Sequence, residues 1–172
     1  MSTFFTSDTH FGHHNLIVNY RGFSTIEEHD ELIIKNWNKI VTKRDKIFLV
    51  GDITMENHKF YPLLAKLNGI KTVVGGNHDL EKDMPYLLKY VEKVVGCIDY
   101  KGFCVTHIPI HPIELIGHYR GNIHGHMHKN RIMINGEIDP RYINVCLDLN
   151  NYTPIPFDKI LEDRLTSYAE GL

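Results

Sequence analysis

The alternation of short β-prone runs with amphipathic helical segments is the feature that most constrains the fold of this chain. Apolar runs at Thr3–Thr6, Lys46–Val50 and Ile70–Val74 have the length of buried strands. The segments Ile26–Ile40 and Lys59–Leu67, which lie between them, carry apolar residues at helical spacing. Because each helical segment separates two strands, the first half predicts parallel strands in a twisted sheet covered by helices.

The boundaries of the predicted helices come from local signals. Ser24-Thr25-Ile26-Glu27 has the Ser-x-x-Glu form of a capping box, which predicts the start of the first helix. His29 lies among charged residues in this helix, and we expect it to be exposed. Further helices are predicted over Met84–Tyr90 and, behind two prolines, over Phe157–Tyr168.

The second half of the chain has a different pattern, with strands in quick succession. The turns Lys101-Gly102 and Asn135-Gly136 are hairpin signals, so we expect antiparallel pairs there. Two mixed sheets packed face to face with helices outside accommodate all the elements, and residues 1–172 are predicted to form one domain. The strands predicted in this half are Val94–Tyr100, Phe103–Thr106, Gly121–His124, Arg131–Ile134 and Tyr142–Leu149.

Composition sets limits on the class of protein. The 172 residues are long enough to bury the core of a layered α/β domain without disulfides. With 19 basic and 21 acidic residues, the formal net charge of −2 gives no strong signal for nucleic-acid or membrane binding. Cys97, Cys104 and Cys146 are odd in number and lie in apolar runs, which predicts reduced core thiols. No leader pattern or membrane-length apolar stretch is present, so a cytoplasmic protein is expected.

Polar side chains follow the predicted strands where each strand ends. Asp8 and His10 follow the first strand, and side chains at i and i+2 of an extended segment share a face. Asp52 follows the second strand, and Asn77 stands in the Gly-rich stretch after the third. The carboxyl ends of parallel strands lie at one edge of a sheet, where catalytic groups of α/β proteins gather.

The second half adds imidazoles in the same kind of place. His107 ends a strand, and His126 and His128 follow Gly125 two residues apart. Nitrogen and oxygen ligands without cysteine suit two divalent ions sharing a carboxylate better than one tetrahedral zinc. Two ions about 3.5 to 4 Å apart form a clamp for displacement at phosphorus by a shared hydroxide. The predicted ligands are Asp8, His10, Asp52, Asn77, His107, His126 and His128.

His78 remains as a proton donor, and we expect the adjacent Asp79 to orient it and raise its basicity. Each short motif taken alone also occurs as an ordinary turn or as a surface histidine; the whole ordered set carries the prediction. Arg21 and Arg120 are candidate phosphate contacts. The histidines outside the ligand set, expected to be structural or exposed, include His13, His14, His111, His118 and His124. Substrate contact is the alternative for His13 and His14, which lie just after the first motif.

The order of these motifs resembles the calcineurin-like metallophosphoesterase superfamily. The matching motifs are Asp8-x-His10, Gly51-Asp52, Gly76-Asn77-His78-Asp79, a lone His107 and Gly125-His126-x-His128. The opening motif also resembles the short stand-alone branch of bacteria and their phages. The resemblance implies a four-layer α-β-β-α sandwich with a dinuclear centre.

Carried over to this chain, the resemblance implies an ion held by Asp8, His10, Asp52 and His128. The second ion would share Asp52 as a bridge, with His78 as the acid for the leaving group; its other ligands would be Asn77, His107 and His126. Many phosphoprotein phosphatases carry Asp-Arg shortly after Gly-Asp, but this chain reads Gly51-Asp52-Ile53-Thr54, which disfavours that activity.

We therefore expect a metal-dependent phosphoesterase acting on a phosphodiester or a small phosphorylated metabolite. Mn²⁺ is the expected metal in vitro, with Fe²⁺, Ni²⁺ and Zn²⁺ as alternatives. A nuclease or 2',3'-cyclic nucleotide phosphodiesterase would use the same centre. The hypothesis from another class is a non-catalytic metal-binding scaffold for protein contacts, which the complete set of ligands disfavours.

Overall fold

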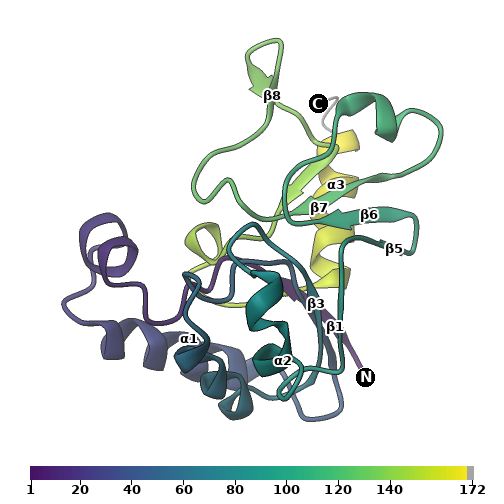
Figure 1. The fold of residues 1–172 in the computed structure, drawn as a ribbon. Helices are drawn as coiled ribbons and strands as arrows, with labels where there is room; N and C mark the ends of the chain where they lie inside the picture. The colour runs from purple at the N-terminus through teal and green to yellow at the C-terminus, as the bar shows by residue number, and fades with distance from the viewer. Residues whose placement is uncertain (170–172) are drawn as a thin grey trace.

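The first sheet is formed mainly by the N-terminal half of the chain in the computed structural model, which describes residues 1–169 (Figure 1). Its order is β11-β1-β2-β3-β4. The four adjacent strands β1 to β4 run parallel to one another, as predicted, and β11 is antiparallel to β1. Residues 170–172, the end of the predicted single domain, lie outside the described residues. The strands are β1 (Thr3–Thr6), β2 (Lys46–Leu49), β3 (Ile70–Val74), β4 (Lys93–Val95) and β11 (Ile155–Pro156).

The second sheet is mixed, with order β10-β7-β6-β5. β5 and β6 are the predicted antiparallel hairpin, but β6 with β7 and β7 with β10 are parallel pairs. The Asn135-Gly136 turn also forms its predicted hairpin, which is a separate two-stranded sheet. The strands are β5 (Ile98–Tyr100), β6 (Phe103–Thr106), β7 (Gly121–His124), β10 (Tyr142–Asn144), and in the hairpin β8 (Met133–Ile134) and β9 (Glu137–Ile138).

One predicted strand is divided between the two sheets. The run Val94–Tyr100 contributes the end of β4 to the first sheet and all of β5 to the second. Gly96 and Cys97 lie between them outside either strand, where the chain passes from one sheet to the other. The predicted strand Tyr142–Leu149 is also shorter than expected, because β10 ends at Asn144 and a 3₁₀ turn, η5 (Leu147–Leu149), follows.

The helix α1 (Ile26–Ile40) has the predicted extent, but its capping box starts one residue later than predicted. The Thr25 hydroxyl accepts from Glu28 N at 3.1 Å, and the Glu28 carboxylate accepts from Ser24 N at 3.0 Å. The second predicted helix is a 3₁₀ helix containing Pro62. The other helical elements are η1 (Asn15–Tyr20), η2 (His58–Lys66), η3 (Glu81–Asp83), α2 (Met84–Leu87), η4 (Pro112–Leu115) and α3 (Phe157–Ala169).

Two hydrophobic layers hold these elements together, one on each face of the first sheet. Leu49 and Val73 face the helices, where they pack in a buried cluster with Trp37 of α1. Phe48 lies on the opposite face of β2, in a second cluster with Phe103 of the second sheet. The side-chain alternation of a strand thus divides β2 between two cores. Figure 1 shows α1 and α2 together beside the first sheet.

The second sheet completes the predicted α/β architecture of two mixed sheets with helices. Phe157 and Ile160 of α3 pack into the core between the sheets. On the outer face, Ile110 N donates to Asn122 Oδ1 at 3.1 Å, and Tyr142 Oη donates to Ile110 O at 2.8 Å. The segment carrying η4 therefore lies over this face of the second sheet.

Candidate metal centre

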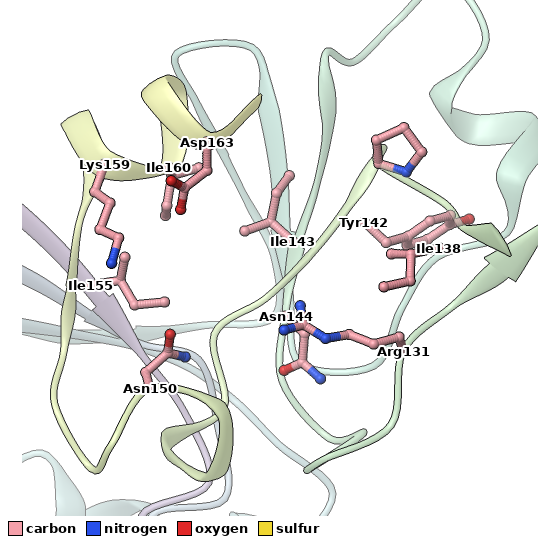
Figure 2. Close-up of a pocket in the computed structure, with 11 residues that line it drawn as sticks. Arg131, Ile138, Tyr142, Ile143, Asn144, Asn150, Ile155, Lys159, Ile160 and Asp163 are labelled. Carbon is pink, nitrogen blue, oxygen red and sulfur yellow. The ribbon is translucent and has the colours of Figure 1, made fainter. Parts of the chain in front are cut away.

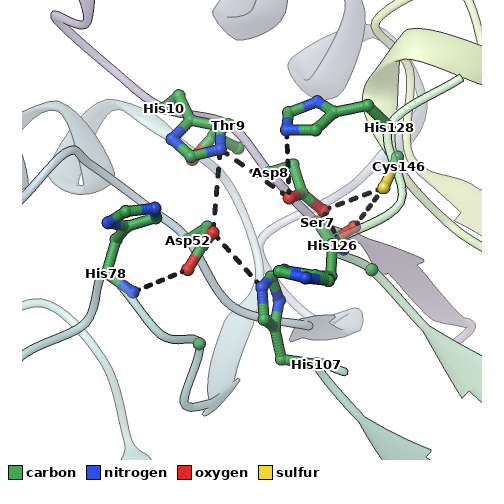
Figure 3. A network of polar contacts seen from close by, with 12 residues as sticks. Ser7, Asp8, Thr9, His10, Asp52, His78, His107, His126, His128 and Cys146 are labelled. Atoms are coloured by element: carbon green, nitrogen blue, oxygen red, sulfur yellow. Dashed lines mark hydrogen bonds and ion pairs between the residues drawn. The ribbon is translucent and has the colours of Figure 1, made fainter. Parts of the chain in front are cut away.

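The ends of strands from both sheets come together, and side chains of the predicted ligands gather there (Figure 3). Asp8 and His10 follow β1, and Asp52 follows β2, its parallel neighbour. His107 follows β6, and His126 follows β7, in the facing sheet. Residues far apart in the sequence therefore come together because parallel strands end at the same edge.

The ligand atoms form two groups, each within 4.8 Å. The first group is Asp8, His10 and His128, and the second is Asp52, His107 and His126. Asn77 joins the second group, since its Oδ1 lies 3.1 Å from His107 Nε2. The structure thus brings together all seven of the predicted ligand residues.

Asp52 lies between the two groups. Its Oδ2 is 3.2 Å from His107 Nε2 and 3.8 Å from His10 Nε2. His10 Nε2 is in turn 3.7 Å from Asp8 Oδ1. One carboxylate oxygen therefore faces an imidazole from each group, as a bridging ligand requires.

The polar atoms of the first group fit a divalent cation. Asp8 Oδ1 and both ring nitrogens of His10 are buried and have no hydrogen-bond partner within the described part of the chain. The 3.7 to 3.9 Å separations of Asp8 Oδ1 from the His10 and His128 nitrogens exceed hydrogen-bond length. A buried charge without a partner is costly, and a cation placed among these atoms would satisfy them.

The backbone of the ligand residues differs from the extended conformation that the sequence analysis assumed. Asp8 and His10 have φ values of 57° and 46°, and His126 and His128 have 67° and 47°. Asp52, with φ 53°, is also left-handed. The paired side chains therefore converge because the chain turns at each ligand, not because alternate residues of a strand share a face. Such conformations cost free energy and cluster at functional sites.

Side chains from outside the motifs hold Asp8 in place. Its Oδ2 accepts from Cys146 Sγ at 2.9 Å and from His126 N at 3.0 Å. Burial and the Asp8 charge raise the pKa of the Cys146 thiol, which keeps it protonated as a donor. Although burial opposes ionisation of Asp8, His10 and the Cys146 and Ser7 donors hold its pKa well below the usual range. Of the predicted core thiols, Cys97 is exposed.

A buried ion pair that the sequence analysis did not predict supports His128. The Asp148 carboxylate accepts from His128 Nδ1 at 3.0 Å, which leaves the other ring nitrogen for Asp8. Arg21 donates to both Asp148 oxygens, at 2.8 and 3.1 Å, and to Asp8 O at 2.6 Å. A carboxylate on the outer nitrogen of a ligand histidine fixes its tautomer and raises its basicity.

Arg21 is therefore committed to the protein interior, contrary to its interpretation as a phosphate contact. The guanidinium side chain is fully buried and also contacts His29 Nε2 at 2.7 Å. His29, expected to be exposed, is buried, with its Nδ1 2.7 Å from Asp30 Oδ1. The charged neighbours of His29 are thus its partners. Arg120, the second candidate, lies over the Phe103 ring at 5.2 Å.

Asp79 has a different place from the one predicted. Its carboxylate is buried and accepts from three backbone groups: Asp52 N at 2.9 Å, Ile53 N at 3.2 Å and Gly76 N at 2.9 Å. The oxygens thus hold the two ligand loops together instead of contacting the His78 imidazole. Burial raises the pKa of Asp79, and the backbone donors oppose that rise.

His78 lies at the rim of the site, with 24% of its side chain exposed. Its backbone N donates to Asp52 Oδ1 at 3.0 Å, and its ring centroid is 5.9 Å from that of His10. The carboxylate beside its ring is Glu56, whose Oε1 is 3.4 Å from Nδ1. Glu56 could not be predicted as a partner of His78, because it lies in a loop with no strand-end motif.

Two further imidazoles, His107 after β6 and His124 in β7, have pKa values shifted in opposite directions. His107 places Nδ1 2.7 Å from Val50 O, which directs Nε2 to Asp52. Burial lowers the pKa of His107, but the adjacent Asp52 carboxylate prevails and raises it to about 9. His124 is buried with Nδ1 against Gly125 O at 2.8 Å, and burial lowers its pKa to about 4. His124 thus supports the loop, as expected.

Two cavities lie in very different surroundings. The one in Figure 2, of about 230 Å³, lies beside α3 and β10 and is lined by none of the predicted ligands. Its Asn144 nevertheless supports the ligand loop, because Nδ2 donates to His128 O at 3.0 Å. A second cleft, of about 340 Å³, is lined by Asn77 and His107 and adjoins the Asp52 group.

None of the helices in the described part of the chain has the length and apolar character that a bilayer crossing requires.

Comparison with known proteins identifies the family. The family model for calcineurin-like phosphoesterases matches residues 1–168, and the chain belongs to this family. It is accordingly a metal-dependent phosphoric ester hydrolase, and the two ligand groups are its candidate sites for divalent ions.

Individual proteins resemble this chain over most of its length. An uncharacterized protein of Methanocaldococcus jannaschii is 36% identical over 166 residues, which cover 91% of this chain and 87% of that protein. The crystal structure of a protein of unknown function from Aquifex aeolicus has a TM-score of 0.71 at 27% identity, covering 94% of this chain and 98% of that one. The nuclease MPE of Pseudomonas putida has a TM-score of 0.50 at 16% identity, covering 79% of this chain and 66% of that one, and shares the fold.

Proposed function

We propose that this protein is a dinuclear phosphoesterase that hydrolyses a phosphodiester or a small phosphorylated metabolite. The observation that carries the proposal is the position of Asp52 Oδ2, which faces His10 of one group and His107 of the other. Two divalent ions bound to these groups would supply a water nucleophile of lowered pKa and neutralise charge on the phosphoryl oxygens. Mn²⁺ is the proposed metal in vitro, because oxygen and imidazole ligands without thiolate suit it.

The ligand residues provide a fixed frame for the substrate. Asp8 and Asp52 are buried, and each accepts from a backbone N–H at 3.0 Å, so neither carboxylate is free to rotate. The Arg21–Asp148 pair similarly fixes the ring of His128. Such preorganisation removes reorganisation from the reaction step.

His78 is the proposed general acid. Glu56 Oε1 faces its Nδ1, so Nε2 is the atom that would donate a proton to the leaving-group oxygen. The partly exposed position of His78 gives its ring access to substrate. Glu56 thus takes the orienting role first assigned to Asp79.

We further propose that the protein works in the cytoplasm. All three cysteines are free thiols, and Cys97 is exposed, which suits a reducing compartment.

The test compares two diesters that differ in leaving group, with protein loaded with Mn²⁺. Bis(p-nitrophenyl) phosphate releases a good leaving group, whereas a dinucleotide releases an alkoxide that needs a proton. We expect His78→Ala to lower kcat on the dinucleotide by about 10²- to 10⁴-fold and on the nitrophenyl diester by much less. Metal content should be unchanged.

His58→Ala is the matched control, because His58 is a partly exposed histidine stacked on Tyr86, and it should leave both rates unchanged. An equal loss on both diesters would contradict the acid role of His78. Lack of turnover by the wild-type protein with each of several divalent metals would overturn the proposed function itself.

A further inference from the structure

The cleft beside the Asp52 group has a lining unlike that of the metal centre. Its volume is about 340 Å³, within the range of small-molecule sites. Three of its lining residues are glycines, Gly75, Gly76 and Gly96, which leave space where side chains would stand. His107 is its single ionisable lining residue.

We propose that this cleft binds one organic arm of a phosphodiester substrate. This arm is uncharged, has the size of a nucleoside, and stays bonded to phosphorus when the leaving group departs. The proposal rests on the proposed function, because it takes the Asp52 group as the place where the phosphoryl group binds. It adds the substrate class, namely a diester whose retained arm carries a flat ring.

The position of the cleft relative to His78 indicates which arm it holds. Asp52 Oδ1 accepts from His78 N, whereas Asp52 Oδ2 faces His107 Nε2. Figure 3 shows His78 and His107 on opposite sides of Asp52. The cleft is lined by His107 and by the stretch Gly75–Asn77 but not by His78 itself, so it opens on the His107 side of Asp52.

The chemistry of the lining favours a ring without charge. The Thr106 hydroxyl donates to Ile108 O at 2.8 Å, and Gly75 N donates to Val95 O at 2.8 Å. Gly76 N donates to Asp79. These polar groups already have partners, while the Ile108 side chain, 52% exposed, offers apolar surface to a ring.

Gly96 gives a way to close the cleft without disturbing the metal centre. A Cβ built on Gly96 meets no atom within 4 Å, and the backbone there does not have the left-handed conformation that disfavours side chains. A leucine at this position should therefore fold and occupy the space. Gly75 and Gly76 are less suitable, because a Cβ on Gly76 would meet the Asp52 carboxylate.

The experiment compares two diesters with the same p-nitrophenolate leaving group, using the full chain loaded with Mn²⁺. One is the p-nitrophenyl ester of thymidine monophosphate and the other is methyl p-nitrophenyl phosphate. We expect the wild-type protein to favour the nucleoside diester by about tenfold or more in kcat/KM. Gly96→Leu should remove most of that preference by raising KM for the nucleoside diester, with the methyl diester unchanged within about twofold.

Ile108→Ala provides a second variant that removes contact area without filling the cleft, and it should lower the preference by about two- to fivefold. Ile116→Ala is its matched control, since Ile116 is 63% exposed and lies outside the cleft lining, and it should preserve the preference. Hydrolysis of both diesters with an unchanged ratio in Gly96→Leu and Ile108→Ala would overturn the cleft assignment alone. Hydrolysis of neither diester by the wild-type protein would instead overturn the proposed function.

Discussion

The two ligand groups are built from the same residue types but are held in place differently. Asp8 and His128 are fixed by side chains distant in sequence, chiefly Cys146 and Asp148. Asp52 is fixed by backbone, since its own N–H donates to Asp79 and its Oδ1 accepts from His78 N. The first group therefore depends on residues outside the recognisable motifs, whereas the second is supported from within them.

The glycines of the motifs show why the second arrangement is local. A Cβ on Gly76 would meet the Asp52 carboxylate, and one on Gly51 would meet the His107 ring. Backbone that approaches ligands this closely leaves little room for side chains between them. Support of the second group therefore comes mainly from main-chain N–H groups that donate to the Asp52 and Asp79 carboxylates.

The largest effect that this comparison predicts is that of Asp79→Asn. The Asp79 carboxylate now accepts hydrogen bonds from backbone donors that include Asp52 N and Gly76 N. In the asparagine variant, the amide N–H₂ would face one of these donors and could not accept from it. We expect the free energy of unfolding to fall by about 3 kcal/mol in urea titrations, because hydrogen bonds to a charged acceptor contribute about 1.5–3 kcal/mol each. The diesterase rate should fall by about 10²-fold, because displaced ligand loops misplace the substrate.

Asp83→Asn is the control for this change, since Asp83 is also a buried carboxylate of the same segment but contacts His58. It should leave kcat/KM unchanged. If Asp79→Asn kept full stability while it altered only the pH dependence of kcat, the originally predicted role beside His78 would be restored.

Asp148→Asn tests the other half of the comparison, with a smaller expected effect. Loss of the negatively charged Asp148 carboxylate beside His128 Nδ1 should weaken Mn²⁺ binding to the first group by about 10- to 100-fold. Calorimetric titration with Mn²⁺ should then resolve one weakened and one unchanged site. Asp139→Asn is the matched control, because it breaks an Arg–Asp pair of 2.6 Å with Arg141, which is not among the ligand groups. Equal weakening of both sites would show that the two groups are not supported separately.

The smallest effect concerns Asp45, which lies outside both ligand groups. Like Asp79, its carboxylate accepts hydrogen bonds from backbone N–H groups. Hydrogen bonds from the Thr42 hydroxyl and from Ser2 N and Thr42 N lower the pKa of Asp45 to about 2 from 3.8. A carboxyl group whose pKa is lower in the folded state than in the unfolded state stabilises the fold. This stabilisation is complete at pH values above the unfolded-state pKa and is lost as the pH falls through the folded-state pKa. The difference in Tm between the wild-type protein and Asp45→Asn should therefore be constant above pH 3.8 and shrink towards pH 2.

A Tm difference that persisted unchanged to the lowest pH would show that packing, not charge, stabilises this turn. The result would sharpen the contrast with Asp79, whose pKa burial raises. Burial outweighs the backbone donors at Asp79, although such donors lower the carboxyl pKa at both positions.

Much of the fold follows from apolar periodicity and turn residues. The run Lys46–Val50 and the helix Ile26–Ile40 depend on local patterns, and the structure has them close to the predicted bounds. The division of Val94–Tyr100 between two sheets was not predictable, because a continuous apolar run carries no sign of which sheet each half joins. A single glycine at position 96 marks that change of sheet.

The candidate site shows the same limit. Strand-end motifs placed the ligand residues together, since parallel strands end at one edge. Asp148 could not be found that way: its partner Arg21 is 127 residues distant, and neither lies in a motif. His29 was misplaced because charged sequence neighbours suggest exposure, whereas the neighbouring Asp30 and the more distant Arg21 are its buried partners.

The left-handed backbone at Asp8 and Asp52 has a consequence for mutational scanning and for directed evolution of this enzyme. Alanine at these positions removes the carboxylate and also adds strain of about 1–2 kcal/mol, so an alanine scan would overstate the importance of the charge. Asparagine tolerates this conformation and preserves the shape, which makes it the cleaner probe of ligand chemistry. Libraries that offer valine, isoleucine or threonine there would discard folded protein before any new metal preference could be selected.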